Sequence, residues 1–222
     1  MRIATEGAFP PFNHRAGDGT LSGFEIDLGQ LLCARMGRRC EWVVTPWNRM
    51  IPGLRAKRFD MVMAGMADTT ARRRKVAFSR GYALKSQNGP IVGLYVARDS
   101  FVTPESALIA VQSDTVHESH LADLGRRIQR HPTAQAALDA VLDHRADVVF
   151  GSPSFLEPKV FRASRSLTLL GREEMKAHGA AVALRHEDEP LLLAINAAMD
   201  ALEADGTLAA LHRKWFVQST DL

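Results

Sequence analysis

Short apolar runs of strand length alternate with longer segments of helical periodicity along the chain. The runs that predict strands are Arg2–Thr5, Cys40–Val44, Asp60–Ala64, Ile91–Ala97, Leu108–Gln112, Asp147–Phe150, Leu167–Leu170 and Ala180–Leu184. The segments that predict helices are Phe24–Met36, Trp47–Lys57, Thr69–Ala77, His117–Arg130, Thr133–His144, Ser154–Phe161, Glu189–Ala204 and a final helix that ends at Phe216. Because strands alternate with helices, the pattern predicts parallel βαβ units and an α/β fold.

The clearest of the predicted helices is Phe24–Met36. Its apolar positions are Ile26, Leu28, Leu31, Leu32 and Met36. Their spacing is mostly that of one helix face, and Gly37 follows at the position where a glycine often ends a helix.

Length and composition fit a folded protein of one or two domains. The chain has 222 residues, of which 46% are apolar and 24% charged, so it can bury a substantial core. The strand and helix pattern falls into two halves that join near residues 88–92. The last helices follow the apolar run Ala180–Leu184, which would return the chain to the first half.

Charge gives little direction about partners. Lys and Arg number 28 and Asp and Glu 25, for a net charge of +3, and the longest basic run is the brief Arg72–Lys75. A nucleic-acid binder usually concentrates basic charge on one face, and the balance seen here neither demands nor excludes an anionic partner. No apolar stretch approaches the 18 or so residues that span a bilayer.

The two cysteines, Cys33 and Cys40, are separated by six residues. They are compatible with a disulfide and equally with two buried thiols. They are too few to fill a zinc site. No signal peptide is evident at the start of the sequence, so the protein is either cytosolic or follows a removed signal.

Patterns that would indicate a metal or a catalytic nucleophile are weak. His117 and His120 share a helix face, but no third ligand is evident nearby, so we expect no metal site. The segment 151–154 lacks the second glycine of a nucleophile elbow. We therefore expect neither a catalytic residue nor a cofactor.

Six segments together carry a family resemblance. They are Ala4–Asn13 (ATEGAFPPFN), Leu21–Leu28 (LSGFEIDL), Trp47–Leu54 (WNRMIPGL), Phe59–Met66 (FDMVMAGM), Ala204–Leu208 (ADGTL) and Lys214–Phe216 (KWF). Each is weak alone, but in this order they resemble the family 3 extracellular solute-binding proteins, the periplasmic amino-acid-binding proteins of ABC importers. The first half is most similar to the subgroup that binds basic amino acids and opines.

The resemblance implies a type II two-lobe periplasmic-binding-protein fold of the α/β class, with a hinge of two crossover strands. Lobe 1 is expected at residues 1–90 and 184–222, and lobe 2 at residues 91–183. The ligand would bind in the cleft, and the lobes would close on it. Subgroup members carry an oxidised Cys-x6-Cys pair, which implies a Cys33–Cys40 disulfide, an oxidising periplasmic compartment and a removed signal peptide.

In lobe 1, Arg72 matches the family arginine that binds the α-carboxylate of the ligand. A guanidinium suits this role because it donates two parallel hydrogen bonds to a carboxylate. The alternative is a solvated basic face, which suits Arg73 and Arg74 better. Phe9 and Trp47 match positions that pack on the carbon chain of the ligand, and their alternative is core packing.

Four further lobe 1 residues match ligand-site positions. Glu6 follows the first predicted strand, where α/β sheets bind ligands, and its carboxylate would pair with a cationic group. Gly65 and Ala67 match positions that offer backbone groups to the ligand, although Ala67 replaces the usual serine or threonine and loses a hydroxyl. Gln87 matches, loosely, a position linked to ligand choice in the opine-binding subgroup.

In lobe 2 the match is weaker. The family has Gly-Thr-Thr where this chain has Ser-Asp-Thr at positions 113–115. Thr115 keeps a hydroxyl and an N–H donor at a predicted helix N-terminus, a position that favours binding of an anion. Simple N-capping of the helix explains a threonine there equally well. Asp114 would weaken anion binding or cap the helix. Ser152 replaces the aspartate that binds the ligand amine, so opines, other secondary amines and small carboxylates join free α-amino acids as candidates.

The resemblance therefore implies capture of a small carboxylate-bearing ligand and its delivery to the membrane subunits of an ABC importer. It also implies a monomer without catalysis and without a nucleic-acid partner. One alternative is an enzyme on the same fold, similar to cyclohexadienyl and arogenate dehydratases. Their lobe 2 glutamate would fall near Ser152–Phe155, where no acid stands, and Glu157 is out of register. A second alternative is the ligand-sensing domain of a receptor, which these residues do not distinguish from the first reading.

Overall fold

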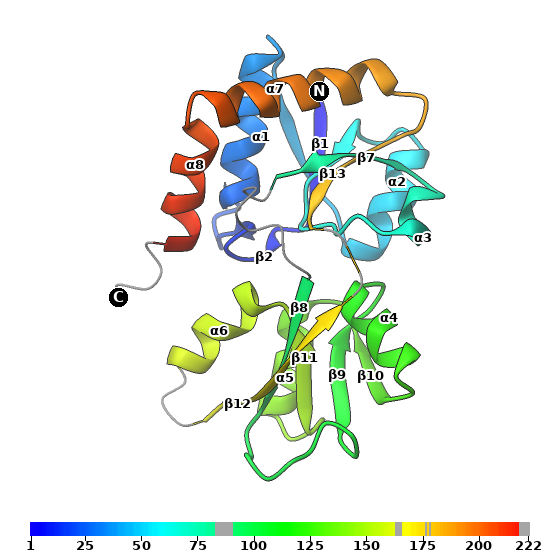
Figure 1. Ribbon diagram of the computed structural model, residues 1–222, viewed down its shortest axis with the longest axis vertical. Coiled ribbons are helices and arrows are strands. Elements are labelled where there is room, and N and C mark those ends of the chain that lie inside the picture. Colours follow the sequence, from blue (N-terminus) through cyan, green and yellow to red (C-terminus); the bar gives the residue numbers. More distant parts are fainter. Residues whose placement is uncertain (83–90, 163–165, 176, 178, 218–222) are drawn as a thin grey trace. The chain divides into compact units, whose positions relative to one another are not determined.

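The computed structural model describes residues 1–82, 91–162, 166–175, 177 and 179–217. The chain divides into unit 1, residues 1–89 and 177–222, and unit 2, residues 90–176 (Figure 1). The strand Ala181–Leu184 pairs within the sheet of unit 1, so it belongs to that unit.

Unit 1 is built on a mixed five-stranded sheet. Its strand order is β5 (Glu41–Val44), β1 (Arg2–Thr5), β6 (Met61–Val62), β13 (Ala181–Leu184) and β7 (Ala77–Gly81). β1 pairs parallel with β5 and β6, whereas β13 is antiparallel to β6 and β7. The prediction of parallel strands therefore holds for only part of this sheet.

Strand β7 is absent from the sequence prediction, which placed a helix over Thr69–Ala77. The helix α3 ends at Arg73 (Thr70–Arg73), and β7 begins at Ala77. Contacts with distant residues hold the strand in place. The Arg80 N–H donates to Asn196 Oδ1 at 2.9 Å, and the Arg80 side chain forms ion pairs with Asp200 and Glu203.

Helices cover both faces of the unit 1 sheet. They are α1 (Phe24–Arg35), the short η1 (Trp47–Arg49) with α2 (Met50–Arg55), α7 (Glu189–Ala204), α8 (Thr207–His212) and a π-helical turn, η3 (Arg213–Val217). Consecutive residues of a strand face opposite sides. Accordingly, Ile3 joins the core with α1, α7 and α8, whereas Ala4 joins the core with α2. A small antiparallel sheet adds β2 (Ala8–Phe9), β3 (Asn13–Arg15) and β4 (Leu21–Ser22).

A disulfide joins the end of α1 to the strand that follows. Cys33 and Cys40 are bonded, with their Cα atoms 6.1 Å apart. Gly37 adopts a φ of +63° in the turn between them, and the Arg38 N–H donates to the Cys33 carbonyl at 2.9 Å. Of the two alternatives that the cysteine spacing left open, the structure contains the disulfide.

Unit 2 also has a mixed five-stranded sheet. Its order is β10 (Arg127–His131), β9 (Leu108–Gln112), β11 (Val148–Gly151), β8 (Ile91–Ala97) and β12 (Thr168–Met175). β9 runs parallel to β10 and β11, whereas β8 is antiparallel to β11 and β12. The helices are α4 (Val116–Asp123), α5 (Ala134–Leu142) and α6 (Pro153–Arg162).

The predicted helix His117–Arg130 is wrong in its second half. Helix α4 stops at Asp123, and Gly125 then turns the chain with a φ of +67°. The next residues form β10, which pairs with β9 over five positions. Pairing with a strand nineteen positions earlier in the sequence therefore overrides the local helical pattern.

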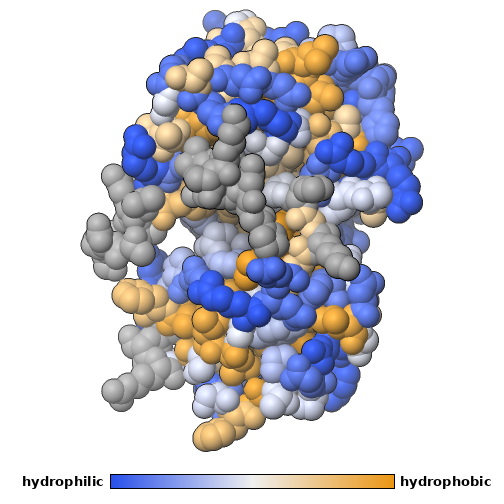
Figure 2. Space-filling view, viewed as in Figure 1, coloured by the Kyte–Doolittle hydropathy of each residue, from blue (hydrophilic) through white to orange (hydrophobic). Residues whose placement is uncertain are grey.

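Among the described residues, no single surface feature indicates a function. Within the described part of the chain, no helix has the length and apolar character needed to cross a bilayer. Figure 2 shows hydrophobic and hydrophilic side chains interspersed over both units. Among the described residues, the most exposed large apolar side chains are Phe101, in the loop between β8 and β9, and Phe161, in α6.

Candidate functional site

The carboxyl ends of β1 and β6 lie at one edge of the unit 1 sheet, because these strands are parallel neighbours. The loop after β1 carries Glu6, which is partly buried, and leads into β2 with Phe9. The loop after β6 carries Gly65, whose φ of +63° suits glycine. A Cβ built on Gly65 would lie 3.0 Å from two ring atoms of Phe9, so the ring rests directly on the glycine.

Three predicted residues meet beside this edge. The Arg72 guanidinium carbon lies 5.2 Å from the centre of the Trp47 ring, within range of a cation–π interaction. Arg72 Nη1 donates to the Ala67 carbonyl at 2.8 Å. The guanidinium of Arg72 therefore lies beside an aromatic wall.

Local sequence explains why Arg72 sits where it does. Thr69 is the N-cap of α3, and its hydroxyl accepts the Arg72 N–H at 3.2 Å. The neighbouring Arg73 is used differently, since Nε donates to the buried Asp68 at 2.7 Å. Arg74 is exposed. The basic run therefore contains three arginines in three environments, and only Arg72 lies on Trp47.

A residue that the sequence analysis missed organises both loops. Glu25 is fully buried in α1, where Oε1 accepts the Gly65 N–H and Oε2 accepts Asn13 Nδ2, each at 2.7 Å. The Tyr82 hydroxyl also donates to Glu25 Oε1. An acidic residue between the apolar residues Phe24 and Ile26 was the available signal.

Burial shifts the pKa values of both Glu25 and Tyr82. Removal from water raises the pKa of Glu25, although the three hydrogen bonds that it accepts act in the opposite direction. Burial, and then the adjacent carboxylate, raise the pKa of Tyr82 well above its ordinary value. The Gly65 N–H already donates to Glu25. This bond differs from the role expected for Gly65, which is to offer a backbone group to a ligand.

The unit 2 residues occupy helix N-termini. Thr115 is the N-cap of α4: its Oγ1 accepts the Glu118 N–H at 3.2 Å and donates to the Gln112 carbonyl at 2.7 Å. The Asp114 N–H donates to Glu118 Oε2 at 2.6 Å. This arrangement resembles a capping box. The cap is thus Thr115 and not Asp114, which instead adopts a φ of +59°.

Ser152 lies immediately before α6. Its Oγ is 2.7 Å from Ser154 Oγ, and its carbonyl accepts the N–H groups of Phe155 and Leu156 at 3.2 and 3.0 Å. Its partners are therefore within the first turn of the helix. The remaining predicted residue, Gln87, lies outside the described residues.

The two histidines of α4 belong to an internal cluster. His120 Nε2 lies 3.1 Å from Glu173 Oε1, and the Tyr95 hydroxyl donates to the same carboxylate. Burial opposes ionisation of Glu173, yet the bonds from Tyr95 and His120 lower its pKa overall. His117 packs edge-on against Phe150. Among the described residues, no group of three His, Cys, Asp or Glu side chains could hold a metal ion.

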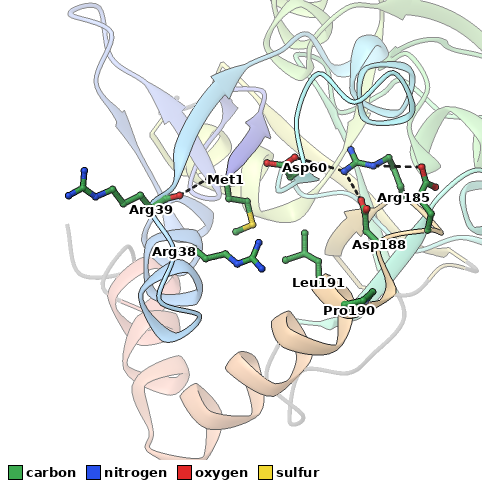
Figure 3. Close-up of a pocket in the computed structure, with 9 residues that line it drawn as sticks. Met1, Arg38, Arg39, Asp60, Arg185, Asp188, Pro190 and Leu191 are labelled. Atoms are coloured by element: carbon green, nitrogen blue, oxygen red, sulfur yellow. Dashed lines mark hydrogen bonds and ion pairs between the residues drawn. The ribbon is translucent and has the colours of Figure 1, made fainter.

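A separate cavity of about 850 Å³ opens in unit 1 (Figure 3). Its lining includes Met1 and Arg39, at the amino end of β1, and Arg185 beside Asp188. Arg185 is already bonded to the Phe59 carbonyl at 2.7 Å and to Asp188 at 2.7 Å. None of the predicted ligand-site residues that the structure describes lines this cavity. It lies at the end of β1 opposite to Glu6.

Comparison with known proteins agrees with the resemblance inferred from the sequence. The model of the bacterial extracellular solute-binding proteins, family 3, matches residues 1–218. The L-arginine-binding protein of Pseudomonas aeruginosa is 28% identical over 230 residues, covering 97% of this chain and 87% of that protein.

Solved structures give the same fold. A periplasmic His/Glu/Gln/Arg/opine family-binding protein from Silicibacter pomeroyi, in complex with lysine, is similar with a TM-score of 0.90 and 32% identity, covering 97% of this chain and 96% of that one. An ancestral amino-acid-binding protein, a precursor of cyclohexadienyl dehydratase, is similar with a TM-score of 0.80 and 25% identity, covering 97% and 94%. The chain therefore belongs to the bacterial extracellular solute-binding proteins of family 3.

Proposed function

We propose that this protein captures a basic amino acid or an opine-like relative in the periplasm and delivers it to the membrane subunits of an ABC importer. The observation that carries the proposal is the placement of Arg72 on Trp47 beside the carboxyl ends of β1 and β6. A guanidinium held on an aromatic ring is suited to a planar carboxylate attached to a carbon chain. Family membership supplies the transport context.

In this proposal unit 1 recognises both ends of the ligand. Arg72 binds the α-carboxylate, and Trp47 and Phe9 pack on the carbon chain. Glu6 pairs with the cationic end, and the loop from Gly65 to Ala67 contributes backbone carbonyl groups. The P. aeruginosa relative is an arginine-binding protein, and the S. pomeroyi structure holds lysine, so a cationic side chain is the first candidate.

Unit 2 contributes less charge to the proposed site. Ser152 accepts a hydrogen bond from an ammonium group but provides no negative charge. Thr115 and Asp114 stand at the N-terminus of α4, where backbone donors face any anionic group of the ligand. This weak charge on the amine side is the reason that opines, which carry a secondary amine, remain candidates beside free amino acids. Gln87 stays a predicted determinant of that choice.

Binding without turnover is part of the proposal. The stretch Ser152–Phe155 contains no acid, and Glu157 is bonded to Arg172 at 2.7 Å. A dehydratase would need a carboxyl group there to transfer a proton. The ancestral structure that precedes a dehydratase is itself described as an amino-acid-binding protein. We further propose a monomer that closes its two units on the ligand.

The test is a calorimetric and thermal-shift screen of the purified protein. The panel contains the twenty amino acids, ornithine, citrulline, octopine, nopaline and prephenate. At a hundredfold excess over Kd, a ligand adds about 2.7 kcal/mol to the free energy of unfolding. Stabilisation by arginine, lysine, ornithine or an opine supports the proposal. Binding of prephenate alone, with turnover, would replace it by the enzyme reading, and no response to any compound would refute the ligand class.

A further inference from the structure

Three polar side chains form a buried cluster beneath the strand-end loops of unit 1. Glu25, Asn13 and Tyr82 are 0%, 0% and 2% exposed. Burying a carboxyl group costs free energy unless hydrogen bonds compensate for the lost water. An apolar side chain would fill this part of α1 at lower cost, since its neighbours Phe24 and Leu28 belong to the main core. The cluster therefore calls for a role beyond packing.

The hydrogen bonds of the cluster end on the backbones of two loops. Glu25 Oε1 accepts the Gly65 N–H at 2.7 Å. Glu25 Oε2 accepts Asn13 Nδ2 at 2.7 Å, and Asn13 Oδ1 in turn accepts the Gly7 N–H at 2.8 Å. One carboxylate thus holds the loop after β6 directly and the loop after β1 through a single amide.

Those two loops carry much of the proposed ligand contact. Gly7 directly follows Glu6, and the Phe9 ring lies so close to Gly65 that a Cβ built there would be 3.0 Å from it. Ala67, two residues beyond Gly65, accepts the hydrogen bond from Arg72. A shift of either glycine would therefore move several groups together. The third partner, Tyr82, fixes Glu25 to the rest of the unit, because the Tyr82 carbonyl is 2.8 Å from His212 Nε2.

We propose that Glu25 is a positioning residue for ligand binding, which sets the Gly7 and Gly65 backbones without touching the ligand. The inference rests on the proposed function, because it concerns the same site. It predicts that the hydrogen-bonding pattern of position 25 matters for affinity, and not only the volume of the side chain.

The pair Asn13 and Glu25 allows a sharp test. In Glu25→Gln, the new NH₂ group meets the Asn13 NH₂ group, and donor faces donor. Turning the Asn13 amide relieves this conflict but breaks its bond from Gly7. Adding Asn13→Asp restores the pattern with the groups exchanged, because the new carboxylate accepts from both Gly7 and residue 25. Tyr82→Phe is the matched control, since it removes one hydrogen bond to Glu25 and keeps the carboxylate that accepts from Gly65 and Asn13.

Two readouts are needed for each variant: Kd for the best ligand of the panel, and amide hydrogen exchange at Gly7 and Gly65 without ligand. We expect Glu25→Gln to bind about tenfold more weakly and to exchange faster at both amides. The double variant should return Kd to within about threefold of the parent, and Tyr82→Phe should also stay within about threefold.

The proposal is overturned if Glu25→Gln keeps the parental Kd and the parental exchange rates, even if its melting temperature falls. It is also overturned if the double variant binds as weakly as the single one. Should Glu25→Gln fail to fold, the double variant decides by the same two readouts. If the parent binds nothing in the panel, the proposed function fails, whereas exchange at Gly7 and Gly65 still decides whether Glu25 holds the loops.

Discussion

In unit 1 the predicted ligand-binding side chains contact one another, whereas in unit 2 they serve helix N-termini. Arg72 lies on Trp47 and bonds to Ala67, and Phe9 rests on Gly65. By contrast, the hydroxyl of Thr115 is engaged within the cap of α4. The first set makes contacts with one another, and the second makes contacts within its own helix N-termini.

This difference predicts where affinity comes from. A side chain held by neighbours in a binding geometry loses little freedom when the ligand arrives. A hydroxyl that already has donor and acceptor partners must exchange them, so a new contact adds little net free energy. We therefore expect substitutions in unit 1 to change Kd strongly, and those in unit 2 to change mainly stability or selectivity.

The largest effect is expected for Arg72→Ala. Loss of charge-assisted hydrogen bonds to a carboxylate should weaken binding about a hundredfold, or about 2.7 kcal/mol. Calorimetric titration measures it, and Arg74→Ala is the control because Arg74 is an exposed neighbour on the same run. A parental Kd in Arg72→Ala would refute the assignment of this site.

Trp47→Ala should rank second. Removing an aromatic wall is expected to weaken binding about tenfold to thirtyfold, since buried aromatic contacts contribute about 1.5–2 kcal/mol. Trp47 also packs against the core with α2, so the variant will lose stability as well. Trp47→Phe keeps a ring, and its affinity should lie between the two. An unchanged Kd in Trp47→Ala would mean that the ring serves only the core.

Ser152→Asp tests the weak charge of unit 2. A carboxylate at this position should strengthen binding of free α-amino acids about tenfold, or about 1.4 kcal/mol, by pairing with the ammonium group. Ser152→Ala is the uncharged control, and titration with one amino acid and one opine compares selectivity. If both ligands bind the aspartate variant as they bind the parent, residue 152 does not face the amine.

Thr115→Ala should change stability more than affinity. Loss of an N-cap costs about 1 kcal/mol in the free energy of unfolding, and Thr115→Ser should retain most of it. Chemical denaturation gives the stability, and Kd should stay within about threefold of the parent. The opposite outcome, weak binding with unchanged stability, would assign the hydroxyl to the ligand and make the two units more alike.

The smallest predicted effect is on the pH dependence of stability. It is expected to differ between His212 in unit 1 and His131 in unit 2. Burial lowers the pKa of His212, although the bond to the Tyr82 carbonyl opposes this. Neutral His212 therefore contributes fully to the free energy of unfolding above its unfolded pKa, near 6.5. This contribution, about 1 kcal/mol at most, is lost as the pH falls through the folded pKa.

Denaturation at pH 7.5 and 5.5 measures this loss, and His212→Gln should reduce it. Burial also lowers the pKa of His131 in unit 2, but that side chain is more accessible to solvent, so His131→Gln should leave the pH dependence nearly as it is. An equal change in both variants would contradict the contrast.

Prediction from sequence succeeded where the signal was local. Helix α1 and the strands β1 and β9 lie where periodicity placed them. It was wrong where pairing partners are distant: β7 was missed, and most of β10 was assigned to a helix. For the candidate site, Arg72 lies near Trp47, and the role of both as ligand-binding residues stays a prediction. Glu25 was missed because its partners Gly65 and Tyr82 are 40 and 57 residues away.

The sequence by itself determined the α/β class and the family, and it offered Thr115 as a cap of α4, because periodicity and capping act between residues three or four positions apart. Tertiary structure decided the rest. It inserted β13 antiparallel beside β6, although Ala183 and its partner Val62 are far apart in the chain. It also bonded the Gly65 N–H to Glu25 and the Thr115 hydroxyl to Gln112. Donors of this kind can serve a ligand or the fold, and only the partner that folding brings within hydrogen-bond distance selects between the two.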